Sequence, residues 1–325
     1  MKRWRVAVAL AGVAGLLLGG CGGEGGEAAP GNGECRVLKI VVTTSILGDI
    51  VGNVAAGSGT VEVLMPVGSD PHSFQASASQ VAALRRADLV VVNGLGLEEG
   101  MSDAIESAAA DGVRVVEAAS FVEALPFTAD PGGEAPTDAE GEGGHGTLDP
   151  HIWTDPARMA DVATGLGEAL AAADPSCPER WREGAAGYRR ELLALDVEIE
   201  AILEVVPAER RKLVTNHGAL GYFADRYGFE VLGTVIPGGD TLAEPSPADL
   251  AHLVETLRRE GVRAIFAETT QAPDLAEAVA AELGEGVAVV DLFTGSLGEP
   301  GSGAETFLSM QRTNAERIAG ALGGS

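Results

Sequence analysis

Short apolar runs alternate with amphipathic segments along most of the chain, and this alternation predicts an α/β fold. The first half contains four β-rich apolar runs, at residues 37–43, 61–65, 88–93 and 113–117. The segments between them place apolar residues at helical spacing. Strands that alternate with helices are typical of a mainly parallel sheet flanked by helices. Residues 212–290 repeat this pattern, and a terminal helix is predicted at about residues 304–322.

Two longer helical segments separate these halves. One is predicted at residues 156–173, and the next begins at Pro178, because proline is favourable in the first turn of a helix. Its apolar residues continue at helical spacing to about residue 206. About 28 residues at 1.5 Å each give a helix roughly 42 Å long. We therefore predict two α/β lobes joined by one long rigid helix, with boundaries at residues 36–177, 178–207 and 208–325.

The N-terminus has the pattern of an export signal. Residues 1–20 begin with basic side chains, continue with an apolar stretch too short to span a membrane and end in small residues. Leu18-Gly19-Gly20-Cys21 resembles a bacterial lipobox, which implies cleavage before Cys21, lipid attachment to its sulfur and a location outside the cytoplasm. The alternative is an ordinary signal with a chance cysteine. Residues 21–35 are rich in Gly and Glu, which predicts a flexible tether.

The net charge limits the possible partners, and the two remaining cysteines could form a disulfide. The formal net charge of −26 argues against nucleic acid or an anionic membrane surface as a partner and suits the attraction of cations. Residues 126–148 are acidic and rich in Gly and Pro, so we expect a mobile loop there. An oxidising compartment would permit a disulfide between Cys35 and Cys177. Two unpaired thiols are the alternative.

Three histidines and one aspartate form a candidate metal site. The chain has five histidines, and two of them occupy the same context, Asp70-Pro71-His72 and Asp149-Pro150-His151. Proline restricts its own backbone and that of the preceding residue, so this tripeptide is a stiff way to aim an imidazole. His217 and Asp291 each end an apolar run. Three imidazoles and a carboxylate are a ligand set for a divalent transition metal, most naturally zinc.

The predicted positions of these residues favour a shared site. Each lies at or beyond the carboxyl end of a predicted strand, where open α/β sheets bind ligands. Two lie in each half of the chain, so the metal would sit in a cleft between the lobes. The alternatives are a surface-loop role for His72 and capping roles for His217 and Asp291. Glu268 ends another strand and is either a hydrogen-bond partner of a ligand histidine or a surface acid.

The other two histidines are weaker candidates. His252 lies inside a predicted amphipathic helix at residues 247–260 and is interpreted as a solvated surface residue. His145 lies in the acidic loop, where it would at most help to collect metal transiently.

Several motifs in order resemble the zinc- and manganese-specific solute-binding proteins of ATP-binding-cassette importers. The resemblance covers about residues 37–322 and is carried by Thr43-Thr44-Ser45-Ile46, Asp70-Pro71-His72-Ser73-Phe74-Gln75, Asn93-Gly94-Leu95-Gly96-Leu97-Glu98, Asp149-Pro150-His151-Ile152-Trp153 and Asn216-His217-Gly218-Ala219-Leu220-Gly221-Tyr222-Phe223-Ala224. It implies two lobes, a long connecting helix and a metal in the cleft, held by His72, His151, His217 and Asp291. It also implies a membrane permease as partner, no enzymatic activity and a monomer. Zinc-binding members often have a histidine-rich loop before the second ligand, whereas this loop has only His145.

The residue at position 217 favours zinc over manganese. In the resembling family this position is commonly histidine in zinc binders and glutamate in manganese binders, and imidazole ligands suit zinc better than manganese. Import of Mn²⁺ remains the main alternative. Two remoter alternatives are a secreted zinc hydrolase, with three histidine ligands and Glu268 as base, and an adhesion protein stabilised by metal.

Overall fold

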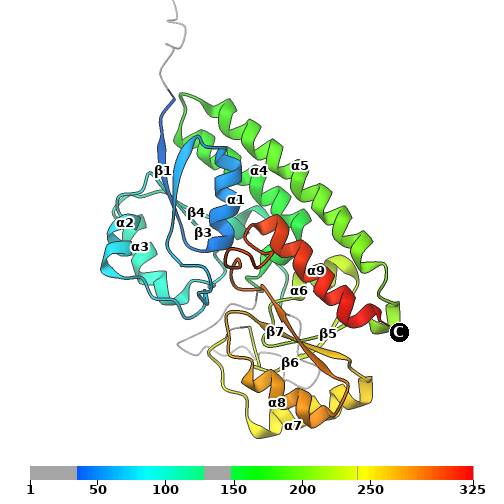
Figure 1. The fold of residues 1–325 in the computed structure, drawn as a ribbon. Coiled ribbons are helices and arrows are strands. Elements are labelled where there is room, and N and C mark those ends of the chain that lie inside the picture. Colours follow the sequence, from blue (N-terminus) through cyan, green and yellow to red (C-terminus); the bar gives the residue numbers. More distant parts are fainter. Residues whose placement is uncertain (1–34, 128–147, 240, 325) are drawn as a thin grey trace, which may run out of the picture. The chain divides into compact units, whose positions relative to one another are not determined.

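Two separate parallel sheets form the framework of the described part of the chain (Figure 1). The computed structural model describes residues 35–127, 148–239 and 241–324. The predicted signal at residues 1–20, the lipidation site Cys21, nearly all of the tether and most of the acidic loop, including His145, lie outside the described residues. Among the helices of the described segments, none is long and apolar enough to cross a membrane.

The first sheet has the strand order β2-β1-β3-β4, and all its strands are parallel. Its strands are β1 (Leu38–Val42), β2 (Gly59–Val63), β3 (Leu89–Val92) and β4 (Val115–Glu117). Parallel neighbours need crossover connections. These are supplied by α1 (Ser45–Ala55), α2 (Ala78–Leu84) and α3 (Ser102–Ala110). Every residue of the central strand β3 is buried, as expected for a strand covered on both faces.

The second sheet repeats this topology with the order β6-β5-β7-β8, again parallel. Its strands are β5 (Lys212–Thr215), β6 (Glu230–Thr234), β7 (Ala264–Glu268) and β8 (Ala288–Leu292). Its helices are α6 (Gly221–Tyr227), α7 (Pro247–Glu260) and α8 (Asp274–Leu283). Single 3₁₀ turns lie at η1 (Glu99–Met101), η2 (Ala118–Phe121), η3 (Ile152–Thr154) and η4 (Ala208–Arg210). The predicted fold class, two α/β lobes with mainly parallel sheets, is confirmed.

Helix α5 (Pro178–Leu203) contributes to the cores of both lobes. It follows α4 (Pro156–Ala173), against which it packs. Its N-terminal part places Trp181 and Leu192 in the core around the first sheet, and its C-terminal part places Ile199 and Leu203 in a core of the second lobe. The helix ends slightly before the predicted residue 206, although Val206 is still buried.

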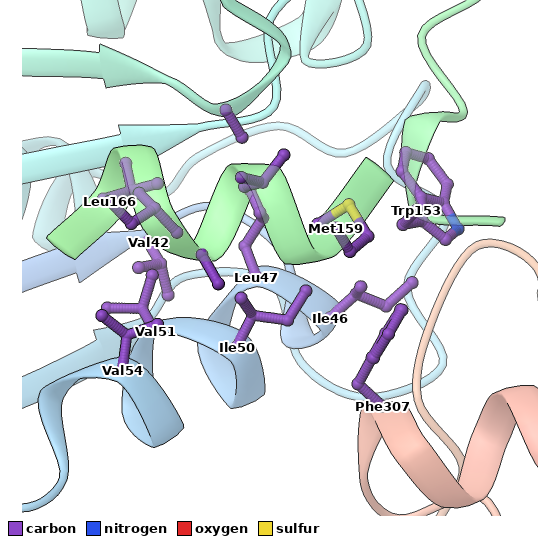
Figure 2. Close-up of a cluster of buried hydrophobic side chains, with 14 of the residues drawn as sticks. Val42, Ile46, Leu47, Ile50, Val51, Val54, Trp153, Met159, Leu166 and Phe307 are labelled. Atoms are coloured by element: carbon purple, nitrogen blue, oxygen red, sulfur yellow. The ribbon is translucent and has the colours of Figure 1, made fainter. Parts of the chain in front are cut away.

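The C-terminal helix α9 (Phe307–Gly323) also spans both cores, which the sequence did not predict. Phe307 and Met310 belong to the core of the first lobe, where Phe307 lies toward Ile46 of α1 (Figure 2). Ile318 and Leu322 belong to a core of the second lobe. Two packed helices therefore connect the lobes, which favours small rearrangements over wide hinge opening.

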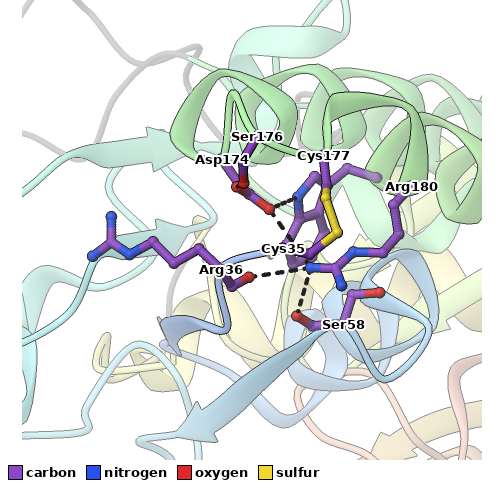
Figure 3. The surroundings of a disulfide bond; sticks show 8 residues. Cys35, Arg36, Ser58, Asp174, Ser176, Cys177 and Arg180 are labelled. Carbon is purple, nitrogen blue, oxygen red and sulfur yellow. Dashed lines mark hydrogen bonds and ion pairs between the residues drawn. A yellow bond between two sulfur atoms is a disulfide. The ribbon is translucent and has the colours of Figure 1, made fainter. Parts of the chain in front are cut away.

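A disulfide joins Cys35, just before β1, to Cys177 in the turn between α4 and α5, with 5.4 Å between the two Cα atoms (Figure 3). Hydrogen bonds surround it. Arg180 Nη2 donates to the backbone carbonyls of Arg36 and Ser58, at 3.1 Å each. The junction is therefore held both covalently and by neighbouring polar contacts.

Candidate metal centre

His72, His151 and His217 converge on one point between the two lobes. Nε2 of His151 lies 3.2 Å from Nε2 of His72 and 3.0 Å from Nε2 of His217. One nitrogen from each ring lies within 4.8 Å of the others, and all three side chains are buried. Zn–N bonds of about 2.0–2.1 Å at tetrahedral angles would place ligand nitrogens roughly 3.3 Å apart. The observed spacing therefore fits three nitrogen ligands of a single ion.

Each Asp-Pro-His tripeptide makes the same local hydrogen bond. Asp70 Oδ1 accepts a hydrogen bond from the backbone N–H of His72 at 3.0 Å. Asp149 Oδ1 accepts one from the backbone N–H of His151 at 2.9 Å. The carboxylate thus fixes the backbone of the histidine two residues later, and the intervening proline restricts the turn. The repeated motif presents two imidazoles from the first lobe.

Buried carboxylates orient two of the rings. His151 Nδ1 lies 2.7 Å from Asp149 Oδ1. His217, two residues beyond β5, makes a short contact through Nδ1 with Oε1 of Glu268 at the end of β7. A carboxylate on Nδ1 fixes the tautomer that leaves Nε2 free to bind a metal. Glu268 therefore contacts a ligand histidine, which is one of the two roles considered for it from the sequence. The corresponding contact of Asp149 with His151 was not predicted. The position of Asp149 two residues before the histidine was the only signal in the sequence.

The structure does not bring Asp291 to this cluster. Asp291 is exposed within β8, where it pairs with Ala267, and its backbone carbonyl accepts a hydrogen bond from Arg317 at 2.7 Å. Side chains alternate between the two faces of a strand, and the next residue, Leu292, is buried in a core of the second lobe. Asp291 consequently faces away from that core. This corrects its assignment as the fourth ligand: within the described residues, the cluster consists of the three histidines.

Comparison with known proteins identifies the family of the chain. Residues 40–321 match the family model described as Zinc-uptake complex component A, periplasmic (ZnuA). The chain belongs to this family.

Individual members of the family cover nearly the whole chain. Zinc-binding protein TroA of Treponema pallidum is 32% identical over 313 residues, which are 95% of each protein. Manganese-binding lipoprotein MntA of Halalkalibacterium halodurans is 31% identical over 308 residues, covering 94% of this chain and 95% of the relative. The solved structure of the periplasmic zinc-binding protein TroA superimposes with a TM-score of 0.76, covering 88% of this chain and 99% of that one, at 30% identity. The family thus includes proteins named for zinc and for manganese.

Burial and neighbouring charges set the protonation of the site. Burial lowers the pKa of His151 well below its usual value, and the nearby His217 adds to this effect. Burial also raises the pKa of Asp149 to about 7. His151 is therefore neutral at neutral pH, which is the form that binds metal.

His217 and Glu268 behave differently because they stabilise each other's charge. Burial alone would lower the pKa of His217, but nearby carboxylates, Glu268 first among them, together outweigh it and the pKa is raised. Burial alone would raise the pKa of Glu268, but neighbouring groups, His217 first among them, together outweigh it and this pKa is lowered. In the metal-free protein the pair is thus charged between the lowered pKa of Glu268 and the raised pKa of His217. Its contribution to stability is lost as pH rises through the pKa of His217, and also as pH falls through that of Glu268.

Metal binding is expected to release a proton from His217. The ion needs the neutral ring, so binding below the raised pKa of His217 should displace about one proton, and affinity should fall as pH decreases through that pKa. Calorimetric titration in two buffers with different heats of ionisation measures the released protons. Glu268→Gln removes the charge that raises the pKa, so this variant should release fewer protons near neutral pH. Identical heats in both buffers for the wild type would contradict the prediction.

Proposed function

We propose that the protein captures Zn²⁺ outside the cytoplasm and delivers it to the permease of an ATP-binding-cassette importer. The observation that carries this proposal is the convergence of three buried histidine Nε2 atoms between two lobes. Membership of the zinc-uptake component family supports the transport role.

The ligand set supports zinc rather than manganese as the ion. Relatives are named for either metal, so the names alone do not choose between them. Imidazole nitrogen suits zinc, whereas manganese prefers more oxygen ligands. The exposed position of Asp291 removes the one carboxylate that was expected among the ligands. Its loss from the set strengthens the argument for zinc.

We further propose that the protein is attached to the membrane by a lipid on Cys21. Similar proteins in Streptococcus pneumoniae and Halalkalibacterium halodurans are named lipoproteins. The lipobox-like sequence before Cys21 has the same implication. The folded unit that begins at Cys35 would then be tethered through the intervening segment.

Catalytic zinc sites often have three protein ligands, as the corrected site does. A zinc hydrolase is therefore the alternative to consider. The residue considered as its base, Glu268, is bound to Nδ1 of His217 and so orients a ligand instead. The relatives that cover nearly the whole chain carry the names of metal-binding proteins. We therefore favour capture over hydrolysis, and over a purely structural role of the metal in adhesion.

Competitive metal binding tests the proposal. Residues 22–325, without the signal and Cys21, would be stripped of metal and titrated with Zn²⁺, with Mn²⁺, and with Zn²⁺ in the presence of a large excess of Mn²⁺. We expect one zinc ion per protein, bound tightly despite the manganese. Preferred binding of Mn²⁺ would retain the import role and overturn the assignment of the metal. A protein that binds neither ion in one-to-one stoichiometry would refute the proposal.

A further inference from the structure

One carboxylate, Asp70, joins the loop that carries His72 to the second lobe. Asp70 Oδ2 accepts hydrogen bonds from Thr241 Oγ1 at 2.6 Å and from Gln271 Nε2 at 2.9 Å. Thr241 lies in the connection between β6 and α7, and Gln271 lies just after β7. All three side chains are partly buried. The same oxygen also accepts a hydrogen bond from Ser73 Oγ in its own loop, at 3.0 Å.

The second Asp-Pro-His motif provides an internal comparison. Both aspartates use Oδ1 to accept the backbone N–H of the histidine two residues later. Asp149 then uses the same atom to contact its own histidine ring at Nδ1. Asp70 instead uses its other oxygen to reach two side chains of the opposite lobe. The cross-lobe contacts are therefore additional to what the turn itself requires.

These contacts form a continuous connection between two metal ligands. Asp70 fixes the backbone of His72 and binds Gln271. The backbone N–H of Gln271 donates to the carbonyl of Glu268 at 3.2 Å, and the Glu268 side chain holds His217. The segments of the two lobes that carry His72 and His217 are thus linked by hydrogen bonds next to the metal site, in addition to the contacts among the histidines themselves.

We propose that Asp70, Thr241 and Gln271 form a latch that controls how fast the bound ion is released. This inference rests on the proposed function. The ion can leave only when the ligand segments separate, and separation of the His72 loop from the second lobe requires that the two hydrogen bonds to Asp70 break. Hydrogen bonds to a charged carboxylate are stronger than those between neutral groups. Asp70 is accordingly a positioning residue that acts through His72.

Other contacts hold the lobes together without the latch. Trp153 Nε1 donates to the carbonyl of Thr294 at 2.7 Å, and Ser45 Oγ lies 3.0 Å from Ser296 Oγ, so the segment that follows β8 is held against the first lobe independently of Asp70. Helices α5 and α9 pack into the cores of both lobes. Loss of the latch should therefore loosen the His72 loop and leave the fold intact.

The test measures the rate of zinc release from residues 22–325. Zinc-loaded protein would be mixed rapidly with an excess of chelator, and the release rate of the wild type compared with Thr241→Val and Gln271→Met, which keep side-chain size and remove the polar group. We expect each variant to release zinc roughly tenfold faster, with an unchanged association rate and an unchanged melting temperature of the metal-free protein. Thr241→Ser retains the hydroxyl and should restore slow release. Ser73→Ala, which removes a bond to the same oxygen from within the loop, should release zinc at the wild-type rate.

The outcomes separate the latch from the proposed function. A wild type that binds no zinc would overturn both. A wild type that binds zinc tightly, with Thr241→Val and Gln271→Met releasing it at the wild-type rate, would overturn the latch alone. Equal acceleration by Ser73→Ala would also overturn it, because the effect would then come from the loop and not from the contact between lobes.

Discussion

Replacing His217 with alanine is expected to cause the largest loss of zinc affinity of any single change considered. The variant removes one of three converging nitrogens and leaves the Glu268 carboxylate buried without its partner. Loss of an outer partner of a metal ligand typically costs about 10- to 100-fold in affinity. We therefore expect Glu268→Gln to fall in that range and His217→Ala to exceed it, as measured by competition with a chelator of known affinity.

Two matched controls make this prediction specific. His252→Ala removes an exposed histidine of α7, and Asp291→Ala removes the exposed acid of β8; both should leave zinc affinity unchanged. His72→Ala provides a second ligand variant that leaves the Glu268 contact in place, so a loss of affinity shared with His217→Ala would not reflect damage around Glu268. A large effect of Asp291→Ala would contradict the corrected ligand set. Circular dichroism of each metal-free variant verifies that the protein is folded.

The sequence predicts local structure best where strong end signals coincide with helical spacing. The predicted bounds of α4 and α7 agree with the structure at residues 156–173 and 247–260. Asp155 and Ser246 cap the two helices, and a proline occupies the first turn of each. At the other end of α7, Gly261 adopts a left-handed conformation with φ 62°, which favours glycine. Such signals are local, so they can be read without knowledge of the fold.

The error at Asp291 shows how a small boundary shift changes a functional assignment. The apolar run suggested that the strand ended at Val290, which would have placed Asp291 in the loop beyond it. The strand continues to Leu292, so Asp291 is an exposed strand residue. Strand ends depend on pairing with the neighbouring strand, here between β7 and β8, and this pairing is not encoded in the local pattern. His217 was placed correctly because it lies two residues beyond β5. An error of one residue in the predicted end of that strand would still leave His217 outside it.

Contacts between distant segments could not be predicted for the same reason, because the local sequence pattern does not encode them. The pattern of α9 predicts a helix but not that its first turns pack into the core of the first lobe. Likewise, Asp70, Thr241 and Gln271 are polar residues of three separate loops, and only the tertiary fold brings them together.

Removal of the disulfide is expected to cause the largest loss of stability while leaving zinc affinity unchanged. Cys35 and Cys177 are 142 residues apart in sequence, so the cross-link restricts a large part of the unfolded chain. Loss of a native disulfide typically costs about 2–5 kcal/mol, and the chain-entropy model gives values at the upper end for loops of this length. We expect the double variant Cys35→Ala/Cys177→Ala to lose free energy of unfolding in this range, measured by denaturant titration of the metal-free protein.

The position of the disulfide explains why zinc affinity should not fall together with the free energy of unfolding. Cys35 precedes β1, whereas His217 follows the carboxyl end of β5, and α5 separates Cys177 from the second sheet in the chain. The hydrogen bonds of Arg180 to Arg36 and Ser58 remain available to hold the junction in the folded variant. Reductant should lower the stability of the wild type to that of the double variant and leave the variant unchanged. If the variant instead lost zinc affinity in proportion to its stability, the metal centre would depend on the cross-link, and the contacts around Arg180 would be insufficient to preserve the first lobe.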